Sequence, residues 1–250
     1  MISSSGHMAA AGLERSDTDY EMVHNDTVWF SAGGSWSGSA PGATASLAIG
    51  TASESREVLV AVWAVCTDTQ NVDISGIEIG GVTAENFAAT SVNMGTGTES
   101  LMVAVASSRV PSGTTTTAKI ILDDTSGNGS YQLRLGLFDC GVPAEITTGS
   151  DNTAHATTQA LDVGDIGDKS SCLAVALFED QSNDDTAIDW TVSVGRTEDE
   201  QGDYTAGSDY STSWLIANGP PSNDFALSCQ PDNPDAGDKG CMAYITAHFN

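Results

Sequence analysis

Val58-Leu59-Val60-Ala61-Val62-Trp63-Ala64-Val65 is an uninterrupted apolar run rich in β-branched residues, which predicts a strand buried on both faces. The pattern returns 114 residues later as Cys172-Leu173-Ala174-Val175-Ala176-Leu177-Phe178-Glu179. At the same spacing Ile74 aligns with Ile188, Gly81 with Gly195, Thr83 with Thr197, Glu85 with Asp199 and Leu101 with Leu215. We therefore predict an internal duplication in which residues 57–107 correspond to residues 171–221 without a gap.

The rest of the chain has the pattern of an all-β protein. From about residue 27 onward, short apolar or alternating segments are separated by Gly, Ser, Thr, Asn and Asp clusters, and no segment has a helical period. Strands are expected near 45–49, 57–66, 73–80, 100–107, 117–122 and 131–139, and again near 159–163, 171–179, 187–195, 211–217, 224–229 and 241–249. This spacing predicts two tandem β-sandwich or jelly-roll-like repeats.

The boundary between the repeats is expected at Gly141-Val142-Pro143, where the strand pattern is interrupted. The chain then divides into an N-terminal arm at 1–25, a first repeat at 26–142 and a second repeat at 143–250. The arm has apolar side chains but no strand-length pattern of its own, so we expect it to become ordered against neighbouring subunits. Ser5-Gly6-His7-Met8 resembles a cloning scar, which leaves open whether residues 1–8 are native.

The net charge of the chain limits the kinds of partner that it can bind. The chain has 34 acidic and 8 basic residues, for a net charge of −26, and such a surface repels phosphate backbones and anionic membranes. We therefore expect no nucleic acid and no membrane partner. Asp exceeds Glu about two to one and lysine is rare, a composition that favours solubility in concentrated salt, where screening reduces self-repulsion. A saline source is one interpretation, and ordinary secreted acidity is the other.

The sequence offers little for catalysis. Its four histidines, His7, His24, His155 and His248, are far apart and share no metal-ligand spacing. The chain contains no nucleophile elbow, zinc-protease helix, phosphate loop or dinucleotide fingerprint. We therefore predict that the protein is not an enzyme.

Cysteine and aspartate residues in one loop suggest two structural features. Cys229 and Cys241 flank the loop 230–240 and are expected to close it as a disulfide if the protein is outside a reducing compartment. Asp232, Asp235 and Asp238 in that loop offer hard oxygen ligands suited to calcium. The alternative is that these aspartates are solvated turn residues. No other cofactor is expected.

Aromatic residues provide the candidate binding positions. Trp29 and Trp36 lie in a Gly/Ser-rich stretch after the arm, where they are candidates for anchoring a neighbour or lining a sugar site. Tyr204, Tyr210 and Trp214 flank a loop that is a candidate glycan or receptor contact. Packing inside the protein is the alternative for all five residues, and Trp63 and Trp190 are expected in the core.

Four successive segments carry a family resemblance: "REVLVAVWAV", "ISGIEIGGVTAENF", "ESLMVAVASSRVPSGTTTTAKIIL" and "YQLRLGLFDCGVP". They resemble a β-sandwich of virion structural proteins from tailed bacterial and archaeal viruses, also found in some secreted bacterial proteins. The segments "CLAVALFEDQ", "IDWTVSVGRTEDEQGDYTAGSDYS" and "CMAYITAHF" are similar to a companion repeat. The resemblance covers about residues 43–250, and the segment 1–42 departs from it.

The resemblance implies a non-enzymatic component of the virion exterior, such as a head decoration, turret or tail protein. Its partners would be other virion proteins, copies of itself and a host-surface glycan. Two alternatives remain open: a secreted or surface carbohydrate-binding module, and a subunit of an extracellular filament or surface layer.

Overall fold

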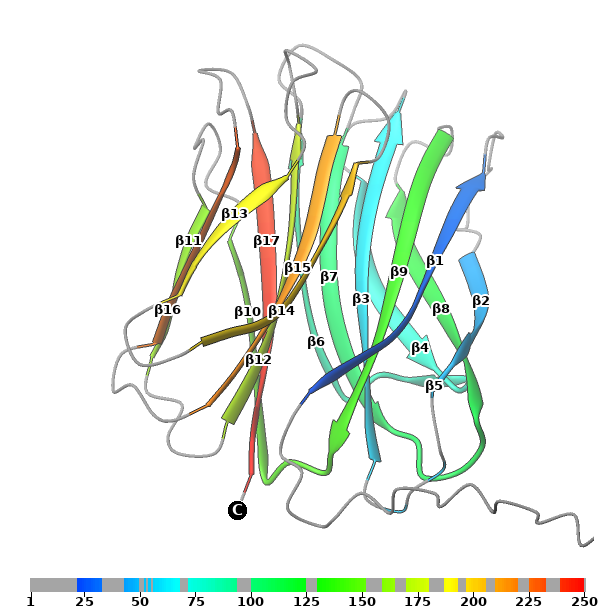
Figure 1. Cartoon of the computed structure of the whole chain (residues 1–250). Helices are drawn as coiled ribbons and strands as arrows, with labels where there is room; N and C mark the ends of the chain where they lie inside the picture. Colours follow the sequence, from blue (N-terminus) through cyan, green and yellow to red (C-terminus); the bar gives the residue numbers. More distant parts are fainter. Residues whose placement is uncertain are drawn as a thin grey trace, which may run out of the picture.

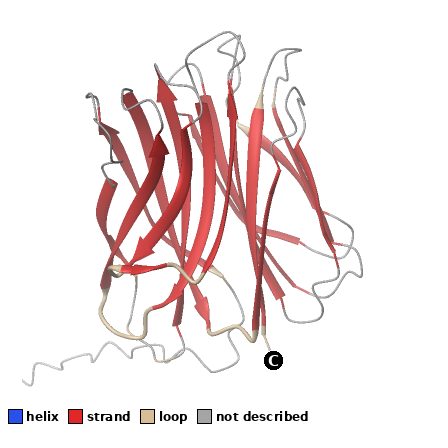
Figure 2. Cartoon of the chain, turned by 180° about the vertical axis from the view of Figure 1, so that it is seen from behind, coloured by secondary structure: helices blue, strands red, loops and turns tan. Residues whose placement is uncertain are grey.

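A computed structural model describes residues 22–32, 43–49, 52, 54, 56–67, 72–93, 100–124, 130–151, 159–164, 170–179, 187–192, 197–205, 210–219, 225–232 and 239–249. Every regular element in these ranges is a β-strand, and the paired strands are antiparallel (Figures 1 and 2). The expected all-β class is therefore confirmed. Among the described residues no helix is long and apolar enough to cross a membrane.

Residues 23–141 form two sheets. Their strands are β1 (Val23–Ala32), β2 (Ala43–Ala48), β3 (Arg56–Thr67), β4 (Val72–Ile79), β5 (Val82–Thr83), β6 (Asn86–Asn93), β7 (Ser100–Arg109), β8 (Thr115–Asp124) and β9 (Ser130–Gly141). One sheet has the order β1-β9-β3-β7-β6 and the other has the order β2-β8-β4-β5. β3 is thus the central strand of the larger sheet, as its apolar sequence requires.

Residues 145–248 form two further sheets. Their strands are β10 (Glu145–Asp151), β11 (Gln159–Gly164), β12 (Ser170–Glu179), β13 (Ile188–Val192), β14 (Thr197–Thr205), β15 (Tyr210–Gly219), β16 (Phe225–Pro231) and β17 (Gly240–His248). The larger sheet has the order β10-β17-β12-β15-β14, and the smaller one has the order β11-β16-β13. The apolar run at 172–179 is again on the central strand, β12.

The four sheets stack as layers, with the two five-stranded sheets in the middle (Figure 1). One buried cluster, which we call the central cluster, joins the two large sheets and includes Leu59, Trp63, Phe138, Leu173 and Trp214. Separate outer clusters fill the space between each large sheet and its smaller neighbour. Each large sheet is therefore covered on both faces.

β3 shows why a continuous apolar run is needed in this position. Alternate residues of β3 point to opposite faces, so Leu59, Ala61, Trp63 and Val65 join the central cluster while Val58, Val60, Val62 and Ala64 join an outer cluster. Burying a side chain of this size stabilises a fold by about 1.5–3 kcal/mol. The expectation that this strand is covered on both faces is confirmed.

The predicted 114-residue offset matches the positions of the central strands in their sheets, but it does not match the strands that follow them. Leu59 and Leu173 lie on β3 and β12 and face the same central cluster. Leu101 also faces this cluster, whereas Leu215 faces the other side of its sheet. Tyr210 pairs with Glu179 on β12, and Leu101 pairs with Val65 on β3. Since Glu179 lies 114 residues after Val65, Tyr210 takes the place of Leu101, and the offset on this strand is 109 residues rather than 114. An odd shift in register turns every side chain to the opposite face.

The structure also corrects the start of the first sheet. β1 begins at Val23, and Met22 is buried in the central cluster with 3% of its surface exposed. The last residues of the segment predicted as an arm therefore belong to the sheet, because their backbone pairs with β9. Residues 1–21 lie outside the described residues. The expected boundary at 142/143 falls in the connection between β9 and β10.

Candidate functional site

Two of the candidate binding aromatics are buried between the large sheets. Trp214 has 2% of its surface exposed, and its ring packs edge-on against Phe138 with 5.1 Å between the ring centroids. Tyr210 is also buried in the central cluster. These positions favour packing over contact with a glycan. Trp29 and Tyr204 lie on β1 and β14, although only their backbone is described, and Trp36 lies outside the described residues.

Side-chain hydrogen bonds connect neighbouring sheets at Ser213 and close to it. The indole Nε1 of Trp63 donates to the Ser213 carbonyl oxygen at 3.1 Å, from the other large sheet. The indole Nε1 of Trp190, on β13, donates to the Ser213 Oγ at 2.8 Å. Nearby, Arg134 Nη1 donates to Thr212 Oγ1 at 3.0 Å, again between the large sheets. Three of the four sheets are therefore connected through one serine.

Arg56 closes one end of the first pair of sheets. Its side chain is almost fully buried, and its guanidinium donates to four backbone carbonyl oxygens, those of Val110 (2.8 Å), Ile49 (2.9 Å), Ser112 (3.1 Å) and Gly113 (3.0 Å). Burial lowers the pKa of Arg56, and the charge of Asp139 opposes this shift. The fork-shaped guanidinium, with five N–H donors, suits this role because it can satisfy several carbonyls at once.

A second buried polar group lies beside this arginine. Ser107 Oγ donates to Glu57 Oε1 at 2.7 Å, and Asn86 Nδ2 donates to Ser107 Oγ at 3.0 Å. Burial raises the pKa of Glu57; the hydrogen bond from Ser107 and the charge of Arg109 lower it, and Glu85 raises it further. Both Arg56 and Glu57 immediately precede the apolar run, and neither of them was singled out from the sequence.

Replacing Glu57 with glutamine is expected to stabilise the protein at neutral pH by on the order of 1 kcal/mol. A carboxyl whose folded pKa is raised supports folding below its unfolded pKa and loses that contribution as the pH rises through the folded pKa. The gain in E57Q should therefore shrink as the pH falls toward about 4, where unfolded glutamate becomes protonated. Urea denaturation of both proteins at several pH values tests this, with Glu145→Gln, at an exposed position of β10, as control. A gain that does not change with pH would contradict it.

The predicted disulfide is not present in the structure. Cys229 and Cys241 are both free, buried thiols, and they belong to different clusters on opposite faces of the sheet that contains β17. The reason is strand alternation: Met242 faces Cys229, with 3.6 Å between their sulfur atoms, so its neighbour Cys241 points the other way. Burial also raises the pKa of the Cys241 thiol, which keeps it protonated.

Of the calcium candidates, only Asp232 is described. Its backbone N–H donates to the Ala187 carbonyl at 3.1 Å, and its Oδ1 accepts from the Ala187 N–H at 3.4 Å. This reciprocal pair ties the end of β16 to the start of β13. Asp235 and Asp238 lie outside the described residues. Within the ranges that the structure covers, no group of three acidic, histidine or cysteine residues is arranged to hold a metal.

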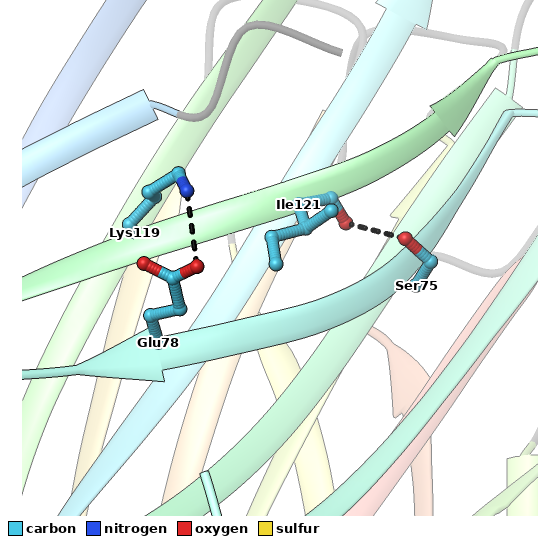
Figure 3. Close-up of polar contacts among 4 residues, drawn as sticks. All are labelled: Ser75, Glu78, Lys119 and Ile121. Atoms are coloured by element: carbon cyan, nitrogen blue, oxygen red, sulfur yellow. Dashed lines mark hydrogen bonds and ion pairs between the residues drawn. The ribbon is translucent and has the colours of Figure 1, made fainter. Parts of the chain in front are cut away.

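Cationic side chains in the described part of the chain are used within the fold. On the outer face of the sheet β2-β8-β4-β5, Lys119 Nζ pairs with Glu78 Oε1 at 3.0 Å, close to the hydrogen bond from Ser75 Oγ to the Ile121 carbonyl (Figure 3). Arg109 Nη2 donates to the Glu54 carbonyl at 2.6 Å. Arg56 and Arg134 bond as described above, and Lys239 is buried. Since the chain has 34 acidic and 8 basic residues, its excess charge is acidic.

One end of the first pair of sheets presents exposed apolar residues. The hairpin between β4 and β5 turns at Gly80 and Gly81, whose φ angles of 65° and 82° favour glycine, and it exposes 64% of Val82. Val142, in the connection after β9, is 37% exposed. The strand ends at this side of the molecule are tied together by Arg56. We regard this surface, which we call the Val82 end, as the candidate contact surface.

These features define an all-β, sandwich-like protein whose described polar contacts hold sheets and strand ends together. No protein-family model matches the chain, and no curated protein matches it either.

Proposed function

We propose that the chain is a non-enzymatic structural protein on the exterior of a virus particle, where it serves as a head decoration, turret or tail component. One observation carries the proposal: the described cations are bonded or buried in a chain with a net charge of −26, so acidic groups dominate the solvent-facing surface. Such a surface keeps particles apart and repels a packaged genome. The resemblance of the apolar segments to virion β-sandwiches supports the same function.

We also propose that the molecule consists of two tandem copies of one sandwich. The order of the large sheets supports this, because β1, β9, β3, β7 and β6 have the same places as β10, β17, β12, β15 and β14. In the small sheets, β2, β8 and β4 correspond in the same way to β11, β16 and β13. A stack of two such sandwiches suits a passive role, since its sheets are joined by burial and hydrogen bonds that need no ligand.

Attachment to the particle is assigned to residues 1–21 together with the Val82 end. Val82 and Val142 are the exposed large hydrophobic residues in the described part of the chain, and burying them against a partner would be favourable. The partners would be other virion proteins, further copies of the chain and a host-surface glycan.

Immunogold labelling of intact particles from the source culture tests the location. Antibodies raised against the purified chain should label intact particles at regular positions. Label found only on disrupted particles would place the protein inside, and label on cell envelopes or filaments would favour a surface-layer or filament subunit. Binding to a glycan array without any particle labelling would favour a carbohydrate-binding module. Each of these results would overturn the proposal.

Removing residues 1–21 is expected to leave the far-UV circular dichroism spectrum unchanged and to reduce incorporation into particles at least about tenfold. The deletion ends before Met22 because that side chain is part of the central cluster. Quantitative blotting of purified particles measures incorporation, and a Val82→Asp variant tests the Val82 end separately. Full incorporation of the truncated chain would show that attachment does not need this segment.

The melting temperature is expected to rise by several degrees between about 0.05 and 1 M NaCl. At −26 the folded chain repels itself, and 1 M salt shortens the Debye length to about 3 Å. Differential scanning calorimetry measures the change, and KCl at the same ionic strength should give a similar rise, because screening depends on ionic strength. A flat or falling melting temperature would contradict salt adaptation.

A further inference from the structure

The inner faces of the two large sheets meet in a pattern with two-fold character. β7 of the first half packs against β17 of the second. β9 of the first half meets β15 of the second, through the Phe138–Trp214 ring contact and the Arg134–Thr212 hydrogen bond. In the strand orders β17 holds the place of β9, and β15 holds the place of β7. The Phe138–Trp214 and Arg134–Thr212 contacts therefore stand where two-fold symmetry would repeat the β7–β17 contact, but the backbones of β9 and β15 approach less closely, so the interface is isologous in outline only.

The centre of the interface fits this symmetry. β3 and β12 are the equivalent central strands, and they contact each other. β12 also contacts β7, and the equivalent contact is between β3 and β15, where Trp63 bonds to Ser213. An axis that exchanges the two halves would thus pass near β3 and β12, as it does at the centre of a symmetric dimer.

The two margins of the interface have diverged. At one margin, β6 meets β10, where Thr148 Oγ1 donates to the Phe87 carbonyl at 3.4 Å and Ser150 Oγ donates to the Ala89 carbonyl at 3.2 Å. Toward the other margin, the aromatic pair Phe138 and Trp214 fills the space between β9 and β15. The strand registers make Ile245 and Val105 the equivalents of these two rings, so the second side of the interface is aliphatic.

We propose that this interface is a self-complementary binding surface in its own right, and that the chain is a covalently joined pseudo-two-fold dimer of sandwiches. The partner that this sheet face fits is a second copy of the same sandwich, and the short connection 142–144 is not needed to hold the halves together. The inference rests on the tandem-copy proposal, but it is independent of the location on a particle.

Cleavage of the connection in the full chain tests this inference. A site-specific protease sequence is inserted between Gly141 and Glu145, next to the exposed Val142, and the purified protein is cut to completion. The two fragments should elute together from a gel-filtration column at the mass of the uncut chain, and should stay together when diluted to about 0.1 μM. Separate elution of two folded fragments, or aggregation on cleavage, would overturn the proposal.

Paired variants locate the interface. In the cut protein, Val103→Asp places a carboxylate in the central cluster and should weaken association at least about 30-fold. Thr117→Asp, on an exposed position of β8, adds the same charge and should change association less than about threefold. Equal effects of the two changes would contradict the assignment. These experiments measure the association of purified fragments. A negative result would therefore contradict this inference without bearing on the location on a particle, and negative particle labelling would not bear on the association of the fragments.

Discussion

Replacing Trp63 with alanine is expected to lower the free energy of unfolding by about 3–5 kcal/mol. The indole lies in the central cluster with 2% of its surface exposed, and it bonds to the Ser213 carbonyl of the facing sheet. Its ring also lies over Gly136, where an added Cβ would be 3.1 Å from the ring carbons. Truncation therefore leaves a cavity between the two halves and a buried carbonyl without this donor.

Urea denaturation followed by far-UV circular dichroism measures the loss. Trp63→Phe keeps one aromatic ring but removes the indole N–H and part of the ring volume, and a smaller loss of about 1–2 kcal/mol is expected for it. A loss below about 1 kcal/mol for Trp63→Ala would show that the central cluster does not hold the halves together.

Replacing Arg56 with methionine is expected to cost about 4 kcal/mol, because four backbone carbonyls lose their donor at a buried position. Methionine fills a similar length of apolar space, so the loss reports the polar bonds rather than packing. Lysine should rescue little, since one ammonium cannot reach four carbonyls at once.

Arg109→Met is the matched control. This exposed arginine is at the same end of the sheets and donates a hydrogen bond to the Glu54 carbonyl, so the loss on replacing it should stay below about 1 kcal/mol. Hydrogen exchange provides a second measurement. In Arg56→Met, the protection of backbone amides should fall first at the ends of β2, β3 and β8. It should fall later in β12, where Ser170 has the position that Arg56 has in β3. Equal losses in the two variants would show that the carbonyl contacts of Arg56 are not what stabilises this end.

The inner strands could be predicted from the sequence, and most of the edge strands could not. The segments expected at 57–66 and 171–179 are β3 and β12, because burial on both faces requires a continuous apolar run. The strands β1, β6, β10 and β14 were missing from the expectation, and all four are edges of the large sheets. β14, with the sequence TEDEQGDYT, is a strong example: acidic side chains suit an edge that must not pair with another chain, and they hide the strand pattern.

Contacts between distant segments account for the other differences. Tyr210 and Trp214 flank a polar loop in the sequence, which suggests exposure, but the facing sheet covers them. Arg56 precedes an apolar run in the way that many strand-flanking charges do, and its role depends on carbonyls up to 57 residues away. No local pattern contains that information, since it arises only when the sheets are stacked.

The five buried cysteines can report when the layers of the molecule separate. Cys66, Cys140, Cys172, Cys229 and Cys241 are all buried, and they are spread over the central cluster and the outer clusters on both sides of it. A thiol reagent in solution can react with them only when the surrounding layer separates. Mass spectrometry of partly labelled protein would therefore show the order in which the layers separate, because each cysteine becomes labelled only when its own layer is exposed.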